Sequence, residues 1–132
     1  MEQIKRQRVY EGGNGVHERI TIDFNQGPVG ELSQLIVASQ PSISGNKVAV
    51  TIQTTNCTGI AGSVALEQTM NDSGSPSIPF SPAISLALAA SALVHAGVDT
   101  VVNLTAARPV LRLVGFTAPT QGRMVIDIVT KF

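Results

Sequence analysis

The sequence contains no tryptophan, a single tyrosine, four phenylalanines and one cysteine, Cys57. One cysteine cannot form an internal disulfide, and a thiol without a partner fits folding in a reducing compartment. Sugar-binding β-sandwiches usually expose Trp or Tyr rings that stack on pyranose rings. This composition therefore weakens a lectin-like interpretation without excluding it.

Charge is also scarce. Charged residues make up 14% of the 132 residues, whereas an average domain has about 25%. Nine basic and nine acidic side chains cancel to a formal net charge of zero, and such a chain does little to repel its own copies. A nucleic-acid binder needs a basic face to displace counterions. We therefore expect a protein that buries surface in an assembly and does not bind nucleic acid.

Long apolar stretches are absent too. No run of eighteen apolar residues occurs, so the sequence predicts no transmembrane helix. The first ten residues are polar and basic, without the apolar segment of a secretion signal. We expect folding in the cytoplasm and no membrane association.

The N-terminal residues differ in character from the rest. Lys5, Arg6 and Arg8 form a basic cluster, Tyr10 follows, and residues 12–15 are Gly-Gly-Asn-Gly. Glycines free the backbone and make a flexible joint. We therefore predict a flexible arm whose basic cluster and tyrosine contact a neighbouring subunit. A merely disordered terminus is the alternative interpretation.

Beyond the arm, apolar and polar residues alternate. In the segment 47–55, Val48, Val50 and Ile52 occupy every second position. A period of two predicts a strand with one buried face. The other segments that predict strands are 16–24, 63–70, 98–105, 110–117 and 123–130, with a short apolar run at 32–38.

Turn residues separate these segments, and none has a strong helical period. The sequence therefore predicts an all-β protein: a single antiparallel β-sandwich, of jelly-roll or Ig-like type, with a flexible N-terminal arm. Residues 1–15 form the arm and residues 16–132 the sandwich domain, a length sufficient to bury its own core.

Three details concern the second half of the chain. Three prolines within 73–82 predict a loop, because proline resists an inner strand. The segment 84–94 fits either helix or strand, and we favour a strand through Leu88. Residues 118–122 have the length of a tight connection, so 110–130 is predicted to be a hairpin.

Candidate catalytic groups are few. The spacing allows a dyad of Cys57 and His95, but a half-buried structural thiol explains the cysteine more simply. His17 is expected at the surface. No zinc-type spacing of cysteine and histidine, calcium loop or phosphate-binding loop occurs. We expect no catalytic residues, no metal and no cofactor. The acidic residues that a glycoside hydrolase would have to pair stand singly at polar strand positions: Asp23, Glu67, Asp99 and Asp127.

Two parts of the sequence resemble small virion structural proteins of tailed bacteriophages. The first part, residues 62–74, is GSVALEQTMNDSG, a strand with a glutamate followed by a Ser/Asp-Gly turn. The second comprises RPVLRLVGFT at 108–117 and MVIDIV at 124–129, and it is similar to the terminal hairpin of those proteins. The resemblance covers roughly residues 33–132.

This resemblance implies a β-sandwich on a virion that is assembled in the host cytoplasm. The implied partners are the major capsid protein or other virion proteins, and the implied oligomer is symmetric, often a homotrimer. Our leading hypothesis is a non-catalytic capsid decoration (cement) protein that binds and stabilises the head lattice. The alternatives are a neck or tail accessory protein of the virion, and a carbohydrate- or receptor-binding β-sandwich module.

Overall fold

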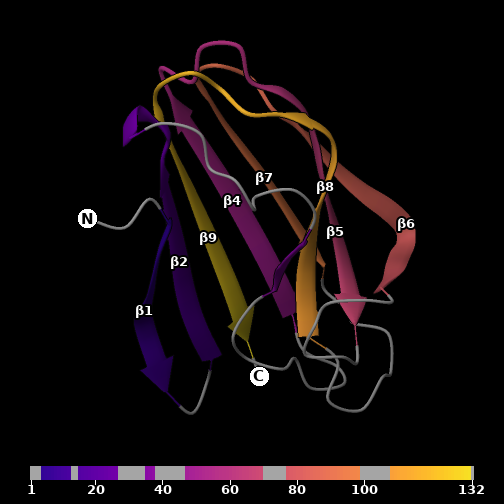
Figure 1. The fold of residues 1–132 in the computed structure, drawn as a ribbon. Helices are drawn as coiled ribbons and strands as arrows, with labels where there is room; N and C mark the ends of the chain where they lie inside the picture. The colour runs from indigo at the N-terminus through magenta and orange to yellow at the C-terminus, as the bar shows by residue number, and fades with distance from the viewer. Residues whose placement is uncertain are drawn as a thin grey trace.

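A computed structural model describes residues 4–12, 15–26, 35–37, 47–69, 77–98 and 108–131. Within these ranges, nine strands and one short 3-10 turn form two antiparallel sheets that face each other (Figure 1). The elements in chain order are β1 (Ile4–Gly12), β2 (Gly15–Asp23), η1 (Phe24–Gln26), β3 (Leu35–Val37), β4 (Lys47–Thr55), β5 (Ala61–Thr69), β6 (Ser77–Ala87), β7 (Ala92–Val98), β8 (Arg108–Thr117) and β9 (Arg123–Lys131).

The strand order identifies the type of sandwich. One sheet has the order β1-β2-β9-β4-β7 and the other β3-β8-β5-β6. From β2 to β9 the chain crosses between the sheets at every connection except the one from β5 to β6. This arrangement of eight strands is a jelly roll, to which β1 adds an edge strand. The prediction of an all-β antiparallel sandwich is confirmed, and the strand order selects the jelly-roll type over the Ig-like one.

The core lies between the inner faces of the two sheets, as the alternation predicted. Ile20, Ile126 and Ile52 are direct neighbours across β2, β9 and β4, and each is at most 1% exposed. Each large aliphatic side chain buried in this way contributes about 1.5–3 kcal/mol. Gln68 is an exception, because it is fully buried and neither amide atom has a hydrogen-bond partner in the described part of the chain.

The predicted flexible arm is an edge strand over its described residues. β1 pairs antiparallel with β2, from Ile4 opposite Ile22 to Gly12 opposite Gly15. Glycine and asparagine between two strands are a hairpin signal, and backbone pairing with β2 fixes the conformation of the segment. The prediction of a flexible arm was therefore wrong for residues 4–12, which form an edge strand of the sandwich. Residues 13 and 14 of the predicted glycine joint lie outside the described residues.

The predicted hairpin at 110–130 is also wrong. β8 lies between β3 and β5, whereas β9 lies between β2 and β4, in the other sheet. The connection at 118–122 therefore crosses from one sheet to the other. Its length is compatible with both arrangements, so loop length alone could not distinguish them.

The described part of the proline-rich segment, residues 77–82, is strand, and residues 73–76 lie outside the described residues. β6 begins at Ser77, inside the predicted loop, and Pro79 pairs with Glu67. β6 is an edge strand whose register slips between Leu66 and Glu67 of β5, and edges and bulges are where strands tolerate proline. The ambiguous segment 84–94 contributes to β6 and β7 rather than to a helix.

Most of the predicted strand at 98–105 lies outside the described residues, and only Val98 belongs to a described strand, β7. Among the residues that the structure describes, no helix has the length and apolar character needed to cross a membrane.

Candidate binding surface at the β1 edge

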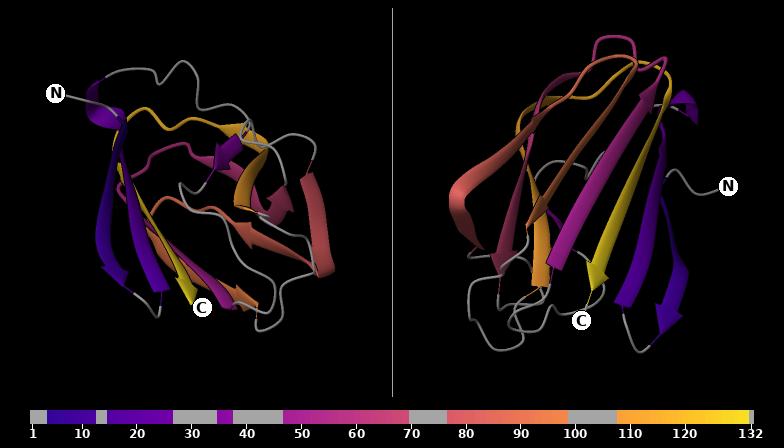
Figure 2. Two further views of the ribbon diagram at one scale, coloured as in Figure 1. Left: turned by 90° about the horizontal axis from the view of Figure 1, so that it is seen from below. Right: turned by 180° about the vertical axis from the view of Figure 1, so that it is seen from behind.

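Strand β1 is exposed along nearly its whole length. Every residue from Lys5 to Tyr10 is exposed, including Val9 at 44% and Tyr10 at 55%. Figure 2 shows β1 at the end of the five-stranded sheet, away from the four-stranded sheet. A strand that buries so little contributes little to the core. Within the described chain its outer backbone edge pairs with no strand, and such an edge is a template for pairing with another chain.

The pairing of β1 with β2 places the predicted interaction residues on both faces of the sheet. Arg6 and Arg8 pair with Ile20 and Glu18, so they lie on the inner face of the sheet, whereas Lys5 pairs with Thr21 on the outer face. A bulge between Arg8 and Tyr10 moves Tyr10 to the outer face, opposite His17. On the inner face, Arg6 Nη1 is 4.0 Å from Oε1 of Glu18, whose side chain is only 7% exposed.

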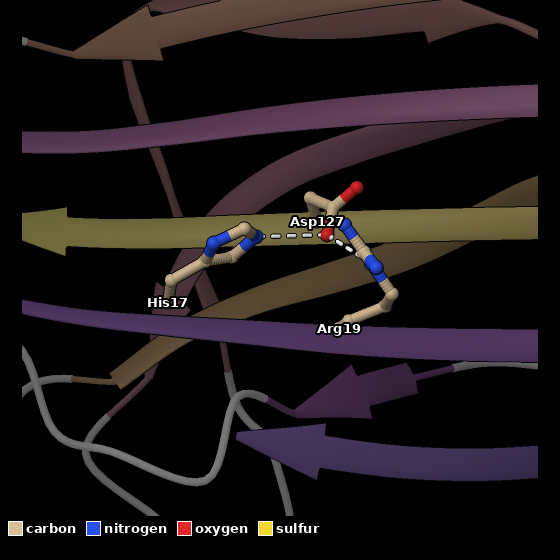
Figure 3. A network of polar contacts seen from close by, with 3 residues as sticks. All are labelled: His17, Arg19 and Asp127. Atoms are coloured by element: carbon tan, nitrogen blue, oxygen red, sulfur yellow. Dashed lines mark hydrogen bonds and ion pairs between the residues drawn. The ribbon is translucent and has the colours of Figure 1, made fainter. Parts of the chain in front are cut away.

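A polar network adjoins Tyr10 on the outer face. Oδ1 of Asp127 lies 2.8 Å from His17 Nε2 and 2.8 Å from Arg19 Nε (Figure 3). Arg19 is directly opposite Asp127, and His17 is two residues away along β2. Ion pairs at such half-exposed positions contribute about 0.2–1 kcal/mol, so the network holds its side chains in place more than it stabilises the fold.

We call Lys5, Tyr10, His17, Arg19 and Asp127 the β1 outer face. The sequence pointed to Lys5 and Tyr10, did not single out Arg19, and placed Asp127 among isolated acids. The available signal was the polar residues at every second position of two predicted strands. The missing information was that β2 and β9, more than one hundred residues apart, are neighbours.

The structure does not bring the candidate dyad together. Cys57 is fully buried in the core, where Sγ contacts the carbonyl oxygens of Arg123 at 3.2 Å and Thr55 at 3.7 Å. His95 is exposed on the outer face of the five-stranded sheet, opposite Thr51. His17 has its orienting carboxylate, Asp127, but among the described residues no hydroxyl or thiol contacts it. No cluster of three or more metal-ligating side chains occurs in the described ranges.

We predict that Cys57 is inert in the folded protein. Burial raises the pKa of its thiol, and the reactive species of cysteine is the exposed thiolate. The native protein should not react with a thiol-specific chromogenic disulfide at neutral pH, and the unfolded chain should react fully. Rapid labelling of the native protein would contradict the buried position.

The remaining candidate acids have structural partners. Glu67 accepts hydrogen bonds from Arg112 Nε at 3.2 Å, Arg112 Nη2 at 3.1 Å and Ser77 Oγ at 2.6 Å. The paired guanidinium holds the pKa of this buried carboxyl below its ordinary value. Asp23 accepts a hydrogen bond from the backbone N–H of Asn25 in η1. Asp99 lies outside the described residues.

Comparisons with known proteins add little beyond the fold. No protein-family model and no curated protein sequence matches the chain. The K3 cleaved adhesin domain of Lys-gingipain from Porphyromonas gingivalis w83 has a TM-score of 0.46 at 10% identity, over 98% of this chain and 72% of that one. Xylanase 10C from Cellvibrio japonicus, solved with xylopentaose, has a TM-score of 0.43 at 11% identity, over 98% of this chain and 27% of that one. Likenesses this distant assign no role to any residue.

Proposed function

We propose that this protein is a non-catalytic virion structural protein that attaches to the head lattice through its β1 edge, as a capsid decoration protein. The exposure of β1 on both faces is the observation that carries this proposal. Three further features support it: the low charge of the chain, its resemblance to virion proteins, and the jelly-roll fold, which viral capsid domains share with lectins. Because fold alone does not determine function, the argument depends on β1.

The charge of β1 indicates what kind of partner it binds. Lys5, Arg6 and Arg8 lie within four residues, and Glu11 is the one acidic residue of the strand. Like charges facing each other across paired strands are destabilising, so the excess of basic residues disfavours pairing between two copies of β1. An acidic surface of the lattice is the complementary partner. A homotrimer should therefore assemble through surfaces other than β1.

The first test is the presence of the protein in particles. Particles purified from the phage whose genome encodes the chain should contain it in many copies, measured by quantitative mass spectrometry. Immunogold labelling should place it over the heads, and labelling of the neck or tail would support the accessory role instead. Its absence from purified particles would sink the virion proposal.

The second part of the test concerns the β1 edge. Lys5→Glu should weaken binding to particles lacking the protein by about fivefold at low salt, and the loss should shrink as salt is raised. Lys47→Glu is the matched control, because Lys47 is an exposed lysine on β4 of the same sheet. Equal effects of the two substitutions would contradict attachment through β1.

A further inference from the structure

A polar depression lies at the loop end of the five-stranded sheet. η1, the end of β4 and the start of β9 meet there, at the top of Figure 1. Its volume is about 360 Å3, at the lower end of the range of about 300–1,000 Å3 for small-molecule sites. The residues lining it are Asn25, Thr55, Asn56, Gln121, Gly122 and Arg123.

The walls of the depression are held by hydrogen bonds. Asn25 Oδ1 accepts from the backbone N–H of Gly122 at 2.9 Å, and the carbonyl of Gly122 accepts from the N–H of Phe24 at 2.9 Å. Gln121 Nε2 donates to Thr58 Oγ1 at 3.0 Å. These bonds join η1 to the β8–β9 connection and that connection to the β4–β5 turn. The depression is therefore preformed, which reduces the ordering cost of binding.

The depression has one charged residue, Arg123, among the residues that line it. Arg123 lies between Asp23 and Thr55 across the three strands, so a carboxylate belongs to its neighbour in the sheet. The N–H of Asn25 lowers the pKa of Asp23, with a smaller contribution from Arg123, so this carboxylate is ionised at neutral pH. Asp23 therefore partly offsets the positive charge of Arg123.

The uncharged groups both donate and accept hydrogen bonds. Asn25, Asn56 and Gln121 present amides and Thr55 a hydroxyl, and all four are exposed. The side-chain amide of Asn56 makes no hydrogen bond within the described chain. A carboxamide both donates and accepts hydrogen bonds. It can therefore pair with a hydroxyl group of a ligand, which also donates and accepts.

We propose that this depression binds a neutral polyhydroxylated ligand, one or two sugar units of a glycan. The volume accommodates a ligand of that size, and the carboxylate of Asp23, the strand neighbour of Arg123, disfavours phosphate and other anions. No aromatic ring lines the depression, so binding depends on hydrogen bonds alone. The dissociation constant should therefore be in the millimolar range.

The experiment is a titration of the 15N-labelled protein with methyl glucoside, methyl galactoside, N-acetylglucosamine and rhamnose, followed by amide chemical shifts. At least one sugar should shift the Gln121 and Gly122 resonances saturably. Asn56→Gly should weaken that binding about fivefold, as expected for one lost hydrogen bond. Glycine keeps the backbone, because Asn56 has a φ of 55° and glycine adopts positive φ freely.

Gln7→Ala is the matched control, because Gln7 is an exposed amide on β1 and lies outside the depression. It should leave sugar binding unchanged, and sodium phosphate should produce no saturable shift at Gln121 or Gly122. Absence of a response to every sugar, or a saturable response to phosphate alone, would overturn the proposal. So would equal effects of Asn56→Gly and Gln7→Ala.

Discussion

Replacing Arg112 with alanine is expected to lower the free energy of unfolding by about 2 kcal/mol. Arg112 donates two hydrogen bonds to Glu67, whose side chain is only 8% exposed. Removing the arginine leaves an ionised carboxylate in a buried position, with the Ser77 hydroxyl as its remaining hydrogen-bond donor among the described residues. The side chain of Arg112 is 45% exposed, so solvent screening keeps the loss below that of a fully buried pair. Urea denaturation of both proteins at neutral pH measures the difference.

The pH dependence separates this electrostatic cause from lost packing. The pKa of Glu67 is lowered in the folded protein, so the pair stabilises the fold above the ordinary pKa of glutamate. That contribution disappears as the pH falls through the lowered pKa. The gap between wild type and Arg112→Ala should therefore be widest near neutrality and narrow in acid. A gap that stays constant with pH would show that the arginine acts through its aliphatic stem.

The sequence predicts features that depend on residues close together in the chain, and it does not predict features that depend on contacts between distant segments. Val48, Val50 and Ile52 could be placed in the core because burial on one face of a strand leaves a period of two in the sequence. Strand partners leave no such trace. The separation of β8 from β9 and the contact of β2 with β9 are set by packing across the whole domain. The low strand propensity of proline predicted a loop at Pro79. That prediction failed because an edge strand needs fewer backbone N–H donors.

The same limit applies to the candidate surfaces. Lys5 and Tyr10 could be singled out as basic and aromatic, but their shared face depends on a bulge at Val9 that the sequence does not announce. The depression at the loop end combines residues from three separate segments, among them Asn25, Asn56 and Gln121. No local pattern joins these amides. Only the crossing of the chain between the sheets brings them together.

The second large effect is expected at Gly122, where the β8–β9 connection meets the end of β4. Gly122 has a φ of 103°, a conformation that side chains with a Cβ rarely adopt. A Cβ placed there would lie 2.4 Å from the carbonyl oxygen of Asn56 and 2.6 Å from that of Thr55. Both are backbone atoms, so the clash cannot be relieved by a side-chain rotation. We expect Gly122→Ala to lower the free energy of unfolding by about 3 kcal/mol.

Gly59→Ala is the control that divides this loss into its two causes. Gly59 also has a positive φ, 86°, but a Cβ there would meet no atom within 4 Å. Its substitution should cost only the backbone strain, about 1 kcal/mol. Equal losses at the two glycines, measured by urea denaturation, would show that the close approach to Asn56 relaxes without cost. A larger loss at Gly122 would show that the β8–β9 connection and the β4–β5 turn pack closely against each other. A preformed depression at this end of the sandwich requires that packing.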